Sequence, residues 1–301
     1  MTTINPLQVF LWTFRRNEKD VVNLYNSLSP IMQIATGNNM LNFGYWKNNA
    51  TKPLEAQHEL CKLVGKIADL DSVKTVLDLG SGFSAPAIQW KSQYENTDIT
   101  CINTNFQQLL FATKLVDNNI SESKANSFSL LQTNGIRFVN ATATLLPFAD
   151  NSVDRIIALE SAQHFTPLDQ FIRESKRTLR KGGMFVIAIP VIKVPVKSSL
   201  FMKLGILSLT WASEHYNLDY IKSAIIKEGF NINEIQLIGS DVYDPLADYY
   251  MKNRKYLRER ILKKYPSYLE NILYKSLLKM KEVSQKGIID YAIIKCTINR
   301  I

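Results

Sequence analysis

The chain has 301 residues, a hydrophobic fraction of 46% and a formal net charge of +9 at pH 7. This length accommodates one large α/β domain, or a core domain with an insertion. The chain has no apolar window of about eighteen residues and no basic head before a long apolar run, so we expect neither a transmembrane span nor a secretory signal. Its three isolated cysteines lack metal-ligand spacing and an even disulfide set, which favours a reducing, cytoplasmic setting.

The first two thirds of the chain predict alternating strands and helices. Apolar spacing predicts a helix over 20–36, an aromatic, asparagine-rich loop over 38–46 and a helix over 54–69. We expect the following strands at 75–78, 99–103, 136–139, 153–159 and 184–189, with helices at 87–94, 107–116 and 169–179 and a turn at 181–183. This alternation favours a parallel, doubly wound sheet.

After residue 190 the alternation breaks. Residues 191–218 are apolar with scattered lysines and predict an inserted cap. The remaining segments predict a helix at 218–229, a strand at 235–238, helices over 246–285 and a final strand at 288–297. We therefore expect an N-terminal helical lid segment over 1–50, a ligand-binding core over 51–190, and the cap, C-terminal helices and last strands over 191–301.

Much of the positive charge lies between residues 252 and 282, where ten Lys or Arg face three Glu, a local net charge of +7. One reading is an anionic partner such as nucleic acid, a membrane surface or a phosphorylated substrate. The other is the solvated face of amphipathic helices. Apolar residues recur at helical spacing through the same stretch, so we favour the second reading.

The stretch Val76 to Ala87, Val-Leu-Asp-Leu-Gly-Ser-Gly-Phe-Ser-Ala-Pro-Ala, indicates a buried strand, a glycine turn and the start of a helix. Gly80 and Gly82 allow torsions and close approaches that a side chain would block. A helix N-terminus places main-chain N–H groups beside a ligand. The spacing of dinucleotide-binding loops is not met, and Asp78 suits an amino-acid-like cation better than a pyrophosphate.

This stretch resembles the first motif of class I methyltransferases. That resemblance implies S-adenosylmethionine as the cofactor and an α/β fold, a doubly wound, seven-stranded Rossmann-like sheet with an inserted helical cap. Residues 51–190 then form the S-adenosylmethionine-binding core. Four further segments resemble, in chain order, the small-molecule subgroup that contains sterol and rebeccamycin-type sugar methyltransferases: Asn42–Trp46, Ile99–Leu109, Phe138–Phe148 and Ala158–Phe165.

The resemblance also implies a set of cofactor contacts. These are Tyr45, Trp46, Asp78, Gly80, Ser81, Gly82, Asn103, Thr104, Gln108, Thr142, Ala143 and Glu160. Many family members have acids where this chain has the neutral Asn103 and Thr142, and a third glycine where it has Ser84. Asp78 is then the one usual acid left to anchor the cofactor.

The acceptor side of the expected site follows the strand at 153–159. The related methyltransferases have Ala-Leu-Glu-Ser followed by two histidines there, and this chain has Gln163 and His164 at those two places. Imidazole takes up protons near neutral pH, so His164 is the candidate general base. Glu160 is the second catalytic candidate, as an orienter of His164 or a contact to the acceptor. The expected substrate contacts are Gln163, Phe165, Trp211 and His215, and we expect no metal ligands.

The expected function is methyl transfer to a hydroxyl, or a carbon, of a small and partly hydrophobic natural-product acceptor. We expect a monomer or homodimer without nucleic-acid partners or stable membrane insertion. Two alternatives stay open. The basic stretch suggests a nucleic-acid methyltransferase, although residues 160–163 stand where amino-methylating members of that class carry an Asn/Asp-Pro-Pro-Tyr/Phe loop. The replacements Asn103, Thr142 and Ser84 suggest weakened cofactor affinity and a non-catalytic S-adenosylmethionine-binding protein.

Overall fold

A computed structural model of the chain describes residues 17–117, 132–133, 135–194, 200–207, 214 and 216–298. The chain forms two compact units. The first unit comprises Met1–Leu60, Pro190–Leu218 and Leu237–Ala292, and the second unit comprises Cys61–Ile189, Asp219–Gln236 and Ile293–Ile301. The division into 1–50, 51–190 and 191–301 concerns roles along the chain and stays a prediction.

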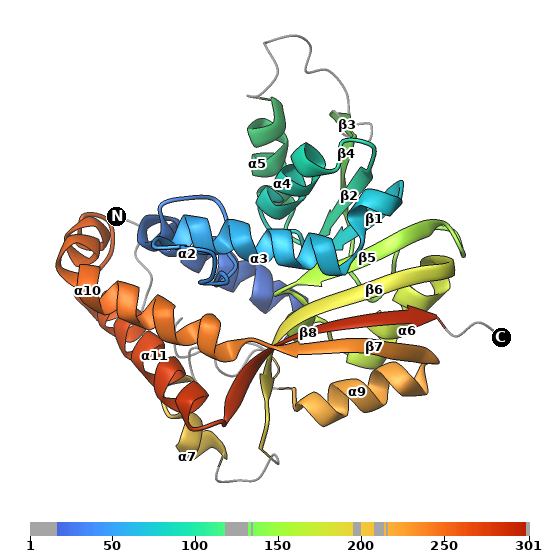
Figure 1. The fold of residues 1–301 in the computed structure, drawn as a ribbon. Helices are drawn as coiled ribbons and strands as arrows, with labels where there is room; N and C mark the ends of the chain where they lie inside the picture. Colours follow the sequence, from blue (N-terminus) through green and yellow to red (C-terminus); the bar gives the residue numbers. More distant parts are fainter. Residues whose placement is uncertain are drawn as a thin grey trace. The chain divides into compact units, whose positions relative to one another are not determined.

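One sheet runs through the chain in the order β3-β4-β2-β1-β5-β6-β8-β7 (Figure 1). Its strands are β1 (Thr75–Leu79), β2 (Asp98–Asn103), β3 (Gln132–Thr133), β4 (Ile136–Asn140), β5 (Val153–Leu159), β6 (Leu179–Ile192), β7 (Phe230–Leu237) and β8 (Ile289–Ile298). The neighbours from β4 through β2, β1 and β5 to β6 pair in parallel. The predicted α/β fold with a doubly wound sheet is confirmed. The one strand beyond the expected seven is β3, whose two residues pair antiparallel with β4.

The helices of the core lie close to their predicted places. They are α3 (Pro53–Ile67), α4 (Ala85–Gln93), α5 (Phe106–Asp117), α6 (Leu168–Thr178) and α9 (Leu218–Lys227). We expected a turn at 181–183 to separate α6 from the next strand. This expectation is wrong, because β6 already begins at Leu179, directly after α6. The pairing of β5 with β6 instead shifts register, and Gly182 adopts a φ of 77° within the strand.

The chain leaves the centre of the sheet in two directions. From β1 it passes through α4 to β2 and through α5 on towards β4, whereas from β5 it passes through α6 to β6. β1 and β5 are therefore neighbours at the point where the strand order reverses. In open α/β sheets, ligands bind beyond the carboxyl ends of the strands at such a point. Asp78 near the end of β1 and Glu160 after β5 border this point.

The central strands are buried on both faces. β5, and β6 from Gly183 on, consist of nearly continuous runs of buried residues, as expected where helices cover both faces of a parallel sheet. Aromatic rings tie α6 to this sheet: Phe171 of α6, Phe185 of β6 and Phe230 of β7 follow one another with centroids 5.3 and 5.6 Å apart. These ring contacts hold α6 against the sheet, so its polar side chains project from a helix with a defined position.

The first unit contains the helices α2 (Glu18–Thr36), α7 (Leu200–Leu204), α10 (Tyr243–Leu262) and α11 (Ser267–Gln285). Part of the positive charge of residues 252–282 is neutralised by ion pairs within this unit. Arg254 and Arg258 both donate to the carboxylate of Glu270, whose side chain is fully buried. The Arg254 guanidinium also lies 3.6 Å from the ring centroid of Tyr274. These contacts favour reading the stretch as the outer side of a packed helix pair.

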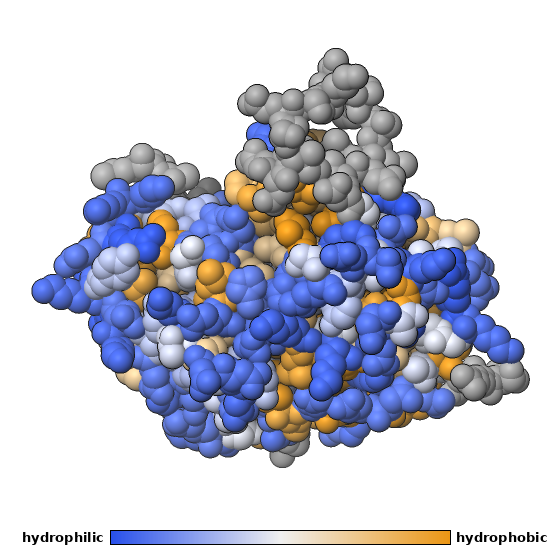
Figure 2. Space-filling model, turned by 45° about the horizontal axis from the view of Figure 1, so that its top comes forward, coloured by the Kyte–Doolittle hydropathy of each residue, from blue (hydrophilic) through white to orange (hydrophobic). Residues whose placement is uncertain are grey.

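Hydrophilic side chains cover most of the face in Figure 2, and apolar ones form small groups between them. Within the described residues, no helix combines the length and the apolar character needed to cross a bilayer.

Candidate active site

The turn after β1 has a backbone that side chains would obstruct. Gly80 and Gly82 adopt φ values of 71° and 56°. A Cβ atom on Gly80 would lie 2.4 Å from the Cβ of Ser161, closer than real atoms come. Ser161 follows β5, and its hydroxyl donates to the carbonyl of Leu79 over 2.6 Å. The turn after β1 and the loop after β5 are therefore locked together at the reversal point.

Ser84, which stands where related loops have a third glycine, takes the left-handed conformation that a glycine would take. Its φ is 57°, and its side chain is fully buried. The hydroxyl contacts that of Ser81 over 3.1 Å, and the main-chain N–H donates to the Ser81 carbonyl over 2.7 Å. The serine thus keeps the shape of the loop, at the cost of backbone strain that glycine would not have.

Asp78 is the buried acid of the site. The residue is 2% exposed, and its Oδ2 has no hydrogen-bond partner among the described residues. Burial raises the pKa of this carboxyl to about 7. A buried carboxylate oxygen without a donor is costly unless a ligand supplies one. The orphaned oxygen therefore fits a ligand that carries an ammonium group.

Asn103 and its neighbours join the ends of β2 and β4. The Asn103 Nδ2 donates to the Gly82 carbonyl over 3.2 Å and to Gln108 Oε1 over 2.9 Å, while its Oδ1 accepts from the Asn105 N–H over 3.1 Å. Asn140 Nδ2 donates to the carbonyls of Asn103 and Thr104. Both amide hydrogens of Asn103 form hydrogen bonds within the chain. In the Asn103 side chain, only Oδ1 would therefore be left to accept a hydrogen bond from a ribose hydroxyl of the expected cofactor.

Thr142 and Ala143 lie in the loop after β4. The Thr142 hydroxyl is 2.9 Å from the hydroxyl of Thr144 and also accepts from the Thr144 N–H over 3.3 Å. Ala143 is 4% exposed. The Thr142 side chain thus shapes its own loop where related enzymes have an acid.

The loop after β5 carries the candidate catalytic groups on a strained backbone. Glu160 has a φ of 52°, and its N–H donates to the Ala188 carbonyl over 2.7 Å. Gln163 Nε2 donates to the Glu160 carbonyl over 2.6 Å. The Gln163 Oε1 is buried and has no partner among the described residues. Strain in a loop of this kind is maintained only by surrounding contacts and is concentrated at functional sites.

His164 ends the 3-10 turn η2 (Ala162–His164), where its N–H donates to the Ser161 carbonyl over 2.9 Å. Burial lowers the pKa of its imidazole to about 4, so the ring is neutral throughout the neutral range. The role of Glu160 as an orienter of His164 stays a prediction. The next residue, Phe165, stacks on Phe171 with centroids 4.8 Å apart.

The strain at Glu160 predicts an ordering of two variants. The left-handed conformation costs an alanine about 1 kcal/mol or more and costs a glycine little. We therefore expect Glu160→Gly to have a free energy of unfolding about 1 kcal/mol higher than Glu160→Ala, as measured by urea denaturation. The opposite order would mean that φ is negative here in solution.

In the first unit, Tyr45 and Trp46 belong to a loop fixed against α3. The Tyr45 N–H donates to the Ala56 carbonyl over 2.8 Å, and a Cβ on Gly44 would lie 2.8 Å from that of Ala56. Trp46 packs on Tyr249 with centroids 5.7 Å apart, and its buried Nε1 has no partner among the described residues. Their role as cofactor contacts stays a prediction. Trp211 and His215 lie outside the described residues.

Three comparisons with known proteins bear on the core. Residues 77–187 match the family model described as a methyltransferase domain. Residues 77–187 thus form a methyltransferase domain, and this match supports a class I S-adenosylmethionine-dependent methyltransferase. S-Adenosylmethionine is accordingly its cofactor, and the orphaned Asp78 oxygen fits the amino group of that molecule.

Two curated relatives cover most of this methyltransferase. It is 28% identical to the methyltransferase GfsG of Streptomyces halstedii over 72% of this chain and 74% of that protein. It is 23% identical to the erythromycin 3''-O-methyltransferase of Saccharopolyspora erythraea over 80% of this chain and 78% of that protein. Among solved structures it resembles the [4+2]-cyclase SpnF, with a TM-score of 0.71, 19% identity and coverage of 94% and 97% of the two chains. This last likeness concerns the fold alone.

Sequence reasoning missed Ser161 as the residue that joins the two site loops. It also missed the polar side chains of α6 that hold the loop after β4. Ser161 had a weak signal, since a small polar residue two positions after β5 faces the glycine turn of β1 in a parallel sheet. The second had none, because the partners are mostly main-chain atoms distant in sequence.

Proposed function

We propose that this methyltransferase methylates a hydroxyl group on a small, partly hydrophobic natural product. One observation carries the proposal. The strand-order reversal between β1 and β5 brings together two loops, one with the buried acid Asp78 for the cofactor and one with the neutral imidazole of His164 for the acceptor. The named relatives support it, since one transfers a methyl group to an oxygen of erythromycin. Methylation of carbon is the variant of this proposal that needs no hydroxyl.

The residues divide the reaction between them. When bound, S-adenosylmethionine supplies a methyl group on a positive sulfur. Asp78 would hold the amino group of that cofactor, and the main chain of the glycine turn would border it. His164 accepts the hydroxyl proton as the new oxygen–carbon bond forms and the sulfur–carbon bond breaks, and then releases that proton to solvent. Positioning of the two reactants supplies most of the rate, because the displacement must occur in line.

The neutral His164 suits this step in one respect. An imidazole that is already deprotonated at pH 7 is available as a base without first losing a proton. Gln163 and Phe165 flank it and are the proposed acceptor contacts, and the orphaned Gln163 Oε1 offers a hydrogen-bond acceptor for a second hydroxyl. Tyr45 and Trp46 are proposed to contact the cofactor as well.

The test is methyl transfer from tritium-labelled S-adenosylmethionine to a panel of macrolactones and glycosylated macrolides, with RNA and double-stranded DNA as comparison acceptors. We expect label in a small-molecule product and none in nucleic acid. Mass spectrometry of that product locates the methylated atom. Label in RNA or DNA would instead support the basic stretch as a nucleic-acid surface, and binding of S-adenosylmethionine without any transfer would support a non-catalytic role.

A further inference from the structure

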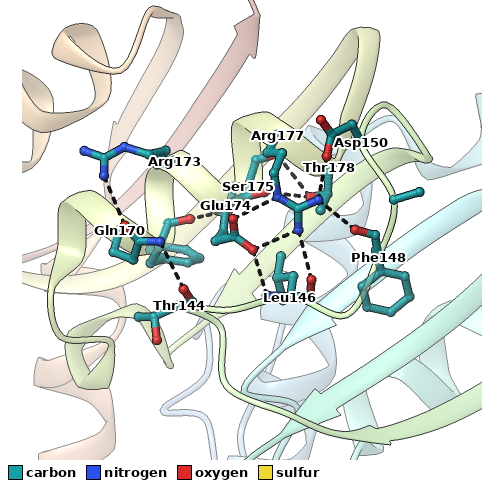
Figure 3. A network of polar contacts seen from close by, with 12 residues as sticks. Thr144, Leu146, Phe148, Asp150, Gln170, Arg173, Glu174, Ser175, Arg177 and Thr178 are labelled. Carbon is teal, nitrogen blue, oxygen red and sulfur yellow. Dashed lines mark hydrogen bonds and ion pairs between the residues drawn. The ribbon is translucent and has the colours of Figure 1, made fainter.

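The loop after β4 is held by one face of α6. Gln170, Glu174 and Arg177 follow one another at spacings of four and three residues, which places them on the same side of a helix. All three contact the segment 142–150 (Figure 3). This segment includes Thr142 and Ala143, two of the cofactor contacts that the resemblance implies.

Arg177 uses every donor of its guanidinium in this contact. Its Nη1 donates to the Phe148 carbonyl over 2.8 Å and to Asp150 Oδ1 over 2.7 Å. Its Nη2 donates to the Leu146 carbonyl over 2.9 Å, and its Nε and Nη2 form a bidentate pair with Glu174 at 2.8 and 2.9 Å. An arginine has five N–H donors in a fixed fork, so these five bonds leave none for solvent or another partner.

Glu174 and Gln170 complete the attachment. The Glu174 Oε2 accepts the N–H of Leu146 over 2.8 Å, and the Arg177 donors hold the pKa of the Glu174 carboxyl below its usual range. Gln170 Nε2 donates to the Thr144 carbonyl over 3.4 Å. Every second residue from Thr144 to Asp150 is thus fixed to α6. Because α6 is itself held by Phe171 on the sheet, the segment has a defined position.

This attachment bears on cofactor recognition because the usual acid is absent. The Thr142 hydroxyl is engaged with Thr144, which leaves main-chain groups as the main means of reading the adenine ring. Main-chain recognition requires an ordered segment, and ordering a residue costs about 1–2 kcal/mol. We propose that Arg177 is a positioning residue for the cofactor, holding segment 142–150 so that its main chain at Thr142 and Ala143 binds the adenine of S-adenosylmethionine. This inference rests on the proposed function and on Thr142 and Ala143 as the cofactor contacts that the resemblance implies.

The experiment compares Arg177→Met, Arg177→Lys and Thr142→Ala with the full-length wild type. Isothermal titration calorimetry well below the melting temperature measures binding of S-adenosylhomocysteine and of adenosine. We expect Arg177→Met to weaken both ligands by the same factor, about tenfold or more, because the lost contact concerns the part that they share. Arg177→Lys should fall in between, since an ammonium cannot form the fork. Thr142→Ala should change affinity by less than about threefold.

Arg180→Met is the matched control. Arg180 pairs with Asp154 over 2.9 Å near the amino ends of the strands and does not contact segment 142–150. It should leave both affinities unchanged. Hydrogen exchange should also rise in residues 142–150 of Arg177→Met and not in Arg180→Met. If Arg177→Met does not fold, Arg177→Lys and Glu174→Gln test the same contacts.

Unchanged affinity in Arg177→Met, or an equal loss in Arg180→Met, would overturn the positioning role. A larger loss in Thr142→Ala than in Arg177→Met would overturn main-chain reading of the adenine. A wild type that binds adenosine and S-adenosylhomocysteine but methylates nothing would overturn the proposed function and leave this inference standing.

Discussion

Replacing Asp78 by asparagine is expected to weaken the binding of S-adenosylmethionine by about a hundredfold while stabilising the ligand-free protein at pH 8. The loss of affinity follows from removing a buried charge that faces the cofactor's amino group, an interaction worth about 3 kcal/mol. The gain in stability follows from the same burial, because an ionised carboxylate without a partner disfavours the folded state. Isothermal titration calorimetry and thermal unfolding measure the two effects.

The stabilisation has a defined pH dependence. The Asp78 carboxyl has a folded pKa of about 7, raised by burial from about 3.8. The folded protein therefore binds the proton more tightly than the unfolded chain, and wild-type stability falls as the pH rises from about 4 to 7. The asparagine variant lacks this decline, so its advantage grows over that range and is complete above pH 7. An unchanged advantage at pH 5 and pH 8 would contradict the assignment.

Cofactor affinity has the opposite slope. The amino group is cationic below pH 7, and the wild type must release the Asp78 proton before the ion pair forms. Affinity should therefore rise from pH 5.5 to 7 in the wild type and stay flat in Asp78→Asn. Asp154→Asn is the control. Asp154 accepts hydrogen bonds from Thr75 at the other end of β1, so this variant should destabilise the fold and leave the affinity and its pH slope intact.

Replacing His164 by alanine is expected to lower kcat by a factor of about 10² to 10⁴, the usual contribution of a general base. The affinity for S-adenosylhomocysteine should change little, because the histidine faces the acceptor in the proposed site. Methyl transfer to the product identified in the acceptor screen measures kcat. A variant with full activity would remove His164 from the mechanism, and a variant with lost cofactor affinity would assign it to the cofactor instead.

The pH profile of kcat gives an independent check on His164. Its imidazole has a pKa of about 4, lowered by burial, so the basic form predominates above about pH 5. Titration of His164 should therefore leave the wild-type kcat level from pH 5.5 to 8 and lower it as the pH approaches 4. An inflection near 6.5 that disappears in His164→Asn would show that the bound acceptor has exposed the ring or paired it.

Much of the fold is predictable because local and tertiary signals agree. The strand expected at 153–159 coincides with β5, since a continuous apolar run between turn residues has one good solution in a buried parallel sheet. Agreement was poorer at residues 181–183. Gly182 and Gly183 indicate a turn on local grounds, but they lie within β6, at the register shift between the residues that pair with Val153 and Arg155.

The site divides in the same way. Asp78 and the two glycines could be found, because the motif marks a strand, a turn and a helix in succession. The left-handed conformations of Ser84 and Glu160 could not, since serine and glutamate rarely adopt them and only the surrounding contacts maintain them. Arg177 was equally inaccessible. Its acceptors include two main-chain carbonyls about thirty residues earlier in the chain, and no side-chain pattern identifies a main-chain acceptor.

The contact between Ser161 and the glycine turn limits how this enzyme can diversify. A parent enzyme that recruits a new acceptor needs to alter the loop after β5 while keeping the cofactor loop intact. Because Ser161 lies against Gly80 and bonds the Leu79 carbonyl, a larger residue there would displace the cofactor loop as well. Variation is thus directed to Gln163 and beyond, and a library built to change acceptor preference should hold Ser161 fixed and vary the residues after it.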